Sequence, residues 1–210
     1  MTQARTIAAQ VKDADLVADR RAHIASAAAR VFRAKGFHNA TIRDVAIAAG
    51  LSQGSLYNYV RSKDDILYLV HQDLTAGYAA YVEQAIAGIV EPRARLRAAL
   101  AAFTHAMAER HADITLIYQE THALGDESRR AVLAQTHHVI QRFEQLIADA
   151  RAAGMALPGA GRLAADIVTF LPVMLALRRW RLRDALPRDA AEAELVGFLL
   201  RGLGIEDDDV

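Results

Sequence analysis

Apolar residues recur at three- and four-residue spacing along almost the entire chain, and this pattern most restricts the fold. Clear runs are Ile24, Ala28, Val31 and Phe32, and then Leu195, Phe198, Leu199 and Leu203. This period is that of an amphipathic α-helix, and no segment alternates in twos as a half-buried strand would. Glycines, prolines and short polar breaks divide the chain into about nine helices. We therefore predict an all-α fold.

The helices are expected to form two domains. The first three are short and the later ones are longer, with a break near residue 61. We expect a flexible N-terminal tail at 1–18, a small domain at 19–61, a larger helical domain at 62–205 that opens with a connecting helix at 62–88, and an acidic tail at 206–210.

Composition excludes several classes of protein. The 210 residues include 25 basic and 25 acidic side chains, and 53% are hydrophobic, which is enough for a packed core. The chain has no cysteine, so disulfides, a thiol nucleophile and cysteine-based zinc sites are excluded. No signal peptide and no apolar stretch long enough to span a bilayer is visible. We expect a cytoplasmic protein without a membrane partner.

The neutral total charge hides an asymmetry. Residues 1–70 carry ten basic against six acidic side chains, whereas residues 71–210 carry fifteen against nineteen. A basic module indicates an anionic partner at the N-terminal end, although chance clustering of a few charges explains the numbers equally well.

A pair of short helices is predicted between residues 41 and 59. Thr41 can cap the first helix, with Asp44 reaching back to the cap, and Gly50 suits the left-handed turn that ends it. Ser52 can cap the second helix, in which Leu56 would anchor the buried side. The second helix would expose hydrogen-bonding side chains at the width of a DNA major groove. The alternative is a purely structural αα-corner.

The next helix begins with a charge that its dipole does not favour. Ser62 can cap this helix, and Asp64 and Asp65 suit its positive end, whereas Lys63 does not. A phosphate approaching the helix start would explain the lysine, and a solvated lysine is the alternative.

From Arg21 to Leu67 the sequence resembles the TetR family of bacterial transcriptional repressors. The resemblance is carried by residues 28–32 (AARVF), 40–46 (ATIRDVA), 49–52 (AGLS), 54–59 (GSLYNY) and 62–64 (SKD), with Val60 in place of the usual phenylalanine. It implies a homodimer that places two recognition helices in successive major grooves of a palindromic operator. It also implies that domain 19–61 binds DNA and that domain 62–205 binds a small-molecule effector and dimerises.

These expectations assign residues to the DNA interface. The residues expected at base edges are Gln53, Ser55 and Asn58, assisted by Arg43. The residues expected near phosphates are Thr41, Tyr57, Tyr59 and Lys63, and Ser52 completes the interface at the helix start.

Three other functions compete with this interpretation. Gly50 to Gly54 satisfy the G-x-S-x-G pattern, but a Ser52 hydrolase would need a preceding strand, so we expect no enzyme. Histidine pairs at helical spacing, such as His105 with Glu109 and His122 with Asp126, do not form the H-E-x-x-H motif, so we expect no metal site and no cofactor. A helical adaptor would explain the helices but not the polar second helix.

The C-terminal domain resembles, more weakly, the branch of the family that senses acyl-CoA thioesters. This similarity rests on residues 117–120 (IYQE) and 177–181 (LRRWR). We expect Tyr118, Phe170 and Met174 to line an apolar pocket, and Arg178, Arg179 and Arg181 to meet CoA phosphates. Glu120 and Trp180 are also expected at the ligand site. Arginines near a helix end also complement its dipole without any ligand. The alternatives to an acyl-CoA are other hydrophobic effectors, such as a drug or a flavonoid.

The last two long helices are expected to form the dimer interface as a four-helix bundle. A helix from 163 to 183 is apolar on all sides as far as Leu177, so a partner should cover one side. The final helix presents one stripe of leucines and two glycines that permit close approach: Leu195, Leu199 and Leu203, with Gly197 and Gly202.

Overall fold

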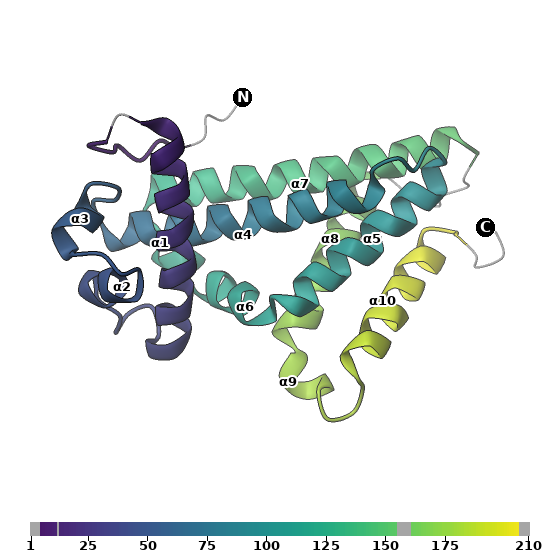
Figure 1. Cartoon of the computed structure of the whole chain (residues 1–210). Coiled ribbons are helices and arrows are strands. Elements are labelled where there is room, and N and C mark those ends of the chain that lie inside the picture. The colour runs from purple at the N-terminus through teal and green to yellow at the C-terminus, as the bar shows by residue number, and fades with distance from the viewer. Residues whose placement is uncertain (1–4, 12, 155–160, 206–210) are drawn as a thin grey trace. The chain divides into compact units, whose positions relative to one another are not determined.

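The computed structural model describes residues 5–11, 13–154 and 161–205. These residues form ten α-helices, one 3₁₀ helix and no strand (Figure 1). The elements are α1 Ala14–Lys35, α2 Ile42–Ala48, α3 Gln53–Tyr57, α4 Lys63–Ile86, α5 Pro92–Glu109, α6 His111–Glu120, η1 Thr121–Ala123, α7 Asp126–Ala152, α8 Gly161–Leu177, α9 Arg179–Leu182 and α10 Arg188–Gly202. The all-α class is confirmed, with one more α-helix than the nine or so expected.

The additional helix arises where we expected one continuous helix from 163 to 183. α8 contains Pro172 and ends at Leu177. Arg178 leaves the helical conformation, with φ −102° and ψ 13°, before the four-residue α9 begins. The expected arginine cluster therefore lies at a helix break and along a second short helix.

The N-terminal segment is packed rather than forming the flexible tail expected at 1–18. Asp13 caps α1 by accepting hydrogen bonds of 3.1 Å from the backbone N–H groups of Asp15 and Leu16. Ile7 and Val17 are buried in the hydrophobic core. Two residues within the tail expected at 1–18 therefore contribute to the core of the first unit. The acidic tail at 206–210 lies outside the described residues.

The chain divides into two compact units whose boundaries differ from the domains expected at 19–61 and 62–205. The first unit combines Met1–Ala76 with Thr115–Gln135, and the second combines Gly77–Ile114 with Thr136–Val210. The helix pair α2–α3 thus packs in one unit with the start of α4, most of α6, η1 and the start of α7. None of the helices in the described ranges is long and apolar enough to cross a membrane.

The first unit has a core to which distant segments contribute. Phe32 of α1, Leu56 of α3 and Tyr68 of α4 are almost fully buried there. Leu116 of α6 and Val132 of α7 belong to the same cluster. Burial of each such side chain contributes about 1.5–3 kcal/mol, so the helix pair depends on segments far along the sequence.

In the second unit, α5 packs against α8 and α10. Three aromatic rings join α4, α5 and α7 edge to face: Tyr78 lies 5.6 Å from Phe103, which lies 5.3 Å from Phe143. Arg142 of α7 donates two hydrogen bonds, of 2.6 and 3.0 Å, to the Glu83 carboxylate of α4. These contacts hold the middle of the unit together.

A buried histidine in the first unit makes stability depend on pH. His71 of α4 is 3% exposed, and burial lowers its pKa from 6.5 to about 4. The Thr121 hydroxyl donates its only proton to the Ile117 carbonyl (2.6 Å) and lies 3.3 Å from His71 Nε2. His71 Nε2 therefore carries a proton and donates to Thr121. Burial, which lowers the pKa, keeps the ring neutral.

We expect the free energy of unfolding to fall as the pH is lowered through the range from 6.5 to 4. In this range the unfolded chain protonates His71 and the folded chain does not, so acid favours unfolding. Between pH 7.5 and 5.0 the loss due to His71 should be about 2 kcal/mol. Urea denaturation of the wild type and of His71→Gln, which has no titrating ring, measures it. Equal losses in the two proteins would show that His71 is not held neutral.

Candidate nucleic-acid interface

A reciprocal set of hydrogen bonds begins α2, as the sequence predicts. The Asp44 N–H donates to Thr41 Oγ1 (3.1 Å), and the Thr41 N–H donates to Asp44 Oδ2 (2.9 Å). Lys35 of α1 adds a 2.7 Å bond to Asp44 Oδ1. Lys35 and, to a smaller extent, Thr41 hold the pKa of the Asp44 carboxyl far below its usual value. The first helix of the pair is therefore fixed at its start.

The turn between α2 and α3 requires a glycine. Gly50 has φ +63°, a conformation that costs an L-residue roughly 1–2 kcal/mol. The Leu51 N–H donates to the Ala46 carbonyl (2.9 Å) and closes the turn. Ala46 and Leu56 are fully buried where the two helices meet. These are the small residue, the turn glycine and the anchor that a helix-turn-helix needs.

α3 carries a short exposed polar face. Ser52 caps it by accepting from the Ser55 N–H (3.0 Å). Gln53 and Tyr57 are exposed, and Asn58, at the C-cap, is half-buried. The Ser55 hydroxyl, which we expected at a base edge, is half-buried and lies 2.8 Å from the Ser52 hydroxyl. Much of its hydrogen-bonding capacity is therefore used within the cap.

Two of the residues expected at phosphates are differently placed from the others. Thr41 and Tyr57 are exposed, as such a role requires. Arg43, expected to assist at a base edge, is exposed as well. Tyr59 is 9% exposed and belongs to the core, so little of it reaches solvent.

The Lys63 ammonium already has partners in its own chain. Its Nζ donates to the His38 carbonyl (3.0 Å) and lies 4.4 Å from the centre of the Phe37 ring. Partial burial lowers the Lys63 pKa, and the charge of Glu120 opposes this shift. These contacts compete with a phosphate for the ammonium, which the sequence interpretation did not foresee.

Side chains of α1 bind the carbonyl groups at the ends of α2 and α3. Arg21 donates to the Tyr59 carbonyl (3.1 and 3.2 Å), and His23 Nε2 lies 3.1 Å from the Ala49 carbonyl. Burial lowers the pKa of Arg21, and the Asp65 charge opposes this. Helix C-termini leave carbonyls without partners, and cations are favoured there. Both residues precede the helix pair, and sequence reasoning did not assign them a role.

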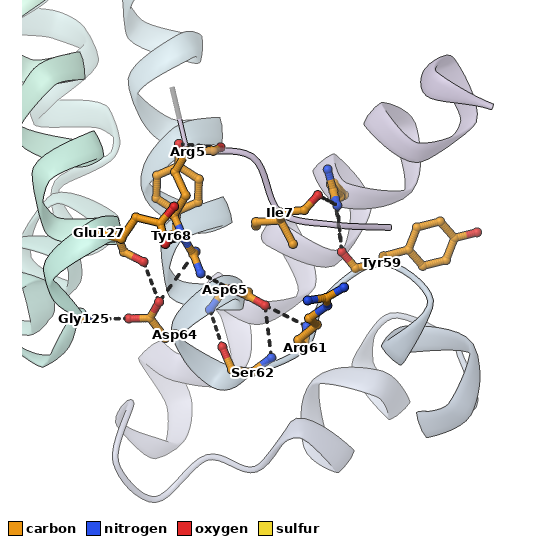
Figure 2. A network of polar contacts seen from close by, with 12 residues as sticks. Arg5, Ile7, Tyr59, Arg61, Ser62, Asp64, Asp65, Tyr68, Gly125 and Glu127 are labelled. Carbon is orange, nitrogen blue, oxygen red and sulfur yellow. Dashed lines mark hydrogen bonds and ion pairs between the residues drawn. The ribbon is translucent and has the colours of Figure 1, made fainter. Parts of the chain in front are cut away.

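A buried carboxylate fixes the start of α4 (Figure 2). Asp65 is 3% exposed and accepts from the backbone N–H groups of Arg61 (2.7 Å) and Ser62 (3.2 Å). Ser62 Oγ accepts from the Asp65 N–H (3.1 Å), which completes the predicted cap. The Arg5 guanidinium pairs with Asp65 from the N-terminal segment.

Related contacts reach the residues that follow α3 and the loop before α7; Figure 2 shows those of Tyr59 and Gly125. Arg21 also donates to the Ile7 carbonyl (2.7 Å), and the Gln10 N–H donates to the Asn58 carbonyl (2.9 Å). Asp64 accepts from the Gly125 N–H (2.7 Å) and from Ser128 Oγ. The N-terminal segment and the start of α4 therefore connect the end of α3 to the loop before α7.

The residues expected to bind an effector are not gathered in one described cavity. Tyr118 and Glu120 belong to the first unit, whereas Phe170, Met174 and the arginines belong to the second. Exposed fractions are 54% for Tyr118, 50% for Phe170 and 72% for Trp180; Arg178 and Arg181 are also exposed, while Met174 and Arg179 are half-buried.

The second unit does contain a cavity, at a place that we did not predict. Its volume is about 130 Å³, and it is lined by Tyr78, Ala79, Val82, Glu83, Phe103, His138, Val139, Arg142 and Phe143. The wall is largely apolar and aromatic, with the Arg142–Glu83 pair among its polar groups. The spacing of apolar residues marks these positions as buried but cannot show that a space is left between them.

The expected dimer stripe is only partly available to a partner. Leu199 and Leu203 are 2% and 4% exposed, so they are buried within their own chain. Leu195 is half-buried and Gly202 is exposed. The exposed large apolar residue of α10 is Phe198, at 61%. The leucine stripe is covered by the packing of α10 within the second unit, which a helical period alone does not reveal.

The histidine pairs considered as metal sites are not formed. His105 Nδ1 lies 2.9 Å from Glu192 Oε2, and its expected partner Glu109 pairs with Arg188. Asp126 accepts from Arg129 (2.6 Å). His122 lies instead near His38 and Glu120.

The capped helix pair, the turn at Gly50 and the polar face of α3 define a helix-turn-helix transcriptional regulator. Residues 24–68 match the family model of bacterial regulatory proteins of the tetR family, and residues 90–180 match that of the tetracyclin repressor-like C-terminal domain. The chain belongs to the TetR family.

Individual relatives agree with this assignment. The HTH-type transcriptional regulator HbdR of Aromatoleum sp. (strain CIB) is 29% identical over 185 residues, which cover 88% of this chain and 80% of HbdR. A tetR-family regulatory protein from Rhodococcus RHA1 has a similar structure, with TM-score 0.77 and 24% identity over 90% of this chain and 98% of that one. AibR, solved with isovaleryl coenzyme A and operator DNA, has TM-score 0.71 and 18% identity over 85% and 97%.

Proposed function

We propose that this regulator is a repressor that binds a palindromic operator as a homodimer and releases it when an acyl-CoA-type effector binds. The exposed polar face of α3, which packs in one core with α1, α2 and the start of α4, supports this function. A helical adaptor would have no use for such a face. Binding to DNA upstream of the regulator's own gene, tested by gel shift against unrelated DNA, separates the two functions.

Within this proposal the residues divide into two groups. Gln53 and Asn58 offer amide groups that can pair with adenine in the major groove. Arg43, exposed on α2, can add a contact to a base or a phosphate. The Tyr57 side chain is exposed, and its hydroxyl suits a phosphate oxygen, a contact that positions the protein without reading sequence. The Thr41 hydroxyl already donates to Asp44 Oδ2 (2.8 Å), so a phosphate would have to compete for it.

Gln53→Ala should change which operator sequences are preferred, because it removes a base contact. At one operator position, the ratio of the affinity for the preferred base to that for the other bases should fall about tenfold. Tyr57→Phe is the matched variant: losing one phosphate bond should weaken all sequences alike, by about tenfold. Affinities for an operator and its single-base variants, measured at one salt concentration, distinguish the two. A uniform loss in Gln53→Ala would contradict its role in base readout.

A dimer is supported by the apolar residues that α8 and α10 leave exposed. Leu163, Ile167 and Phe170 recur at helical spacing along α8 and are 65%, 44% and 50% exposed. Phe198 of α10 is 61% exposed. Large apolar side chains gathered on exposed helix faces mark protein–protein contacts, and a two-fold dimer would cover the same surface on both subunits.

Phe198→Glu should yield folded monomers that no longer bind the operator tightly, because a buried carboxylate at the interface would have no partner. Leu133→Glu, at a residue of α7 that is 57% exposed, is the control and should remain dimeric. Sedimentation velocity at micromolar concentration measures the outcome. A dimeric Phe198→Glu protein would place the interface elsewhere. Leu199→Glu is unsuitable because that side chain is buried in its own chain.

The cavity among α4, α5 and α7 is the best candidate for the apolar part of an effector. Its aromatic wall suits a small acyl or aromatic group, and its position differs from the pocket expected around Tyr118 and Phe170. AibR, a structural relative, was solved with isovaleryl coenzyme A. For phosphates of such a thioester, Arg178 and Arg181 are exposed cations. An effector whose binding free energy is about 2.7 kcal/mol more favourable for the conformation that does not bind DNA shifts the equilibrium between the two conformations roughly 100-fold.

Operator release should follow the CoA thioester rather than the free acid. Release is measured over a panel of acyl-CoAs, the matching acids and unrelated hydrophobic drugs.

Ala79→Leu should fill the cavity and abolish release, while Ala80→Leu, at an exposed position of the same helix, should not. Arg178→Ala should lower CoA sensitivity. Equal potency of acids and thioesters would contradict the role of the arginines, and unchanged release by Ala79→Leu would contradict the cavity.

A further inference from the structure

We propose that His38, Glu120 and His122 form a binding site for a divalent transition metal ion, with Zn²⁺ the best fit. His38 lies between α1 and α2, Glu120 ends α6, and His122 lies in η1. One ligand atom from each residue can be chosen so that all three atoms lie within 4.8 Å of one another. All three residues belong to the first unit. The site joins two turns that are far apart in the sequence.

The donor atoms match the chemistry of zinc. Two imidazole nitrogens and one carboxylate oxygen are ligands that Zn²⁺ accepts, at about 2.0–2.2 Å each. Around a tetrahedral ion such ligands lie about 3.3 Å apart. His38 Nε2 and Glu120 Oε2 are already separated by 3.3 Å. Both imidazoles are exposed, so small rotations would bring the third ligand in without disturbing the core.

One oxygen of the Glu120 carboxylate lacks a hydrogen-bond donor. Its Oε2 atom is buried and receives no hydrogen bond. The His38 ring supplies a charge only when it is protonated. Burial lowers the pKa of Lys63, and the charge of Glu120 only partly opposes this; the Lys63 Nζ donates to the His38 carbonyl. A bound cation would satisfy the oxygen that these groups leave unpaired.

The surroundings hold the first ligand in position. The Lys63 bond to the His38 carbonyl fixes the backbone of this residue, and the His38 ring packs against Phe37 at 5.4 Å. Three protein ligands leave the fourth tetrahedral position to water, as in open zinc sites. In the part of the chain that the structure describes, His38, Glu120 and His122 form the only such group of three.

Binding would link the segment that leads into α2 to the segment that follows α6. A ligand bound only by the folded chain stabilises it by mass action, and free metal at 100 times the dissociation constant raises the ratio of folded to unfolded chain about 100-fold. The metal would therefore stabilise the unit that carries the helix-turn-helix.

The test uses the full chain without a histidine tag, freed of metal by a chelator. Titration with ZnCl₂ in a calorimeter should show one ion per chain, and the same addition should raise the melting temperature. CoCl₂ should give the visible absorption bands of tetrahedral Co²⁺. The double variant His38→Ala/His122→Ala should lose more than tenfold in affinity and the whole thermal shift. Glu120→Gln should also bind more weakly.

The matched control is His137→Ala, which removes an exposed histidine of α7 outside the site and should bind Zn²⁺ like the wild type. Circular dichroism of each variant without metal checks that it is folded. The proposal is overturned if the wild type binds less than one ion per chain, or if the His38/His122 variant binds Zn²⁺ as tightly as the wild type.

Discussion

The buried carboxylate of Asp65 is the interaction on which the arrangement of the DNA-binding unit depends. A charge removed from water costs several kcal/mol unless it is paired and hydrogen-bonded. Here two backbone N–H groups and the Arg5 guanidinium supply those partners. Satisfying one carboxylate thus fixes both the start of α4 and the N-terminal segment. That segment also reaches the end of α3, through the hydrogen bond from the Gln10 N–H to the Asn58 carbonyl (2.9 Å).

Features set by neighbouring residues were predictable from the sequence. The caps at Thr41, Ser52 and Ser62 and the turn at Gly50 are confirmed, since each depends on residues within a few positions. Features set by distant residues were not. Arg5 pairs with a carboxylate 60 positions away, and no local pattern marks residues 5–11 as packed.

Burial was the second limit on prediction. A helical period identifies an apolar stripe but not what covers it, so Leu199 and Leu203 were assigned to a partner although their own chain buries them. Tyr59 and Ser55 likewise lie in a polar stretch of the sequence that predicts exposed side chains. Tyr59 nevertheless packs in the core, and the Ser55 hydroxyl pairs with the Ser52 hydroxyl. The exposed polar face at α3 is accordingly smaller than the sequence predicts, and consists mainly of Gln53, Tyr57 and the half-buried Asn58.

We infer that the network around Asp65 and Arg21 holds α3 in place, and hydrogen exchange of the full chain measures this. Arg21→Gln removes the bonds to the Tyr59 and Ile7 carbonyls. Amides of residues 53–60 should then exchange at least about tenfold faster than in the wild type, because local opening becomes less costly. Arg20→Gln, at an exposed neighbour on α1, should leave them unchanged. Wild-type protection of residues 53–60 in folded Arg21→Gln would contradict the account.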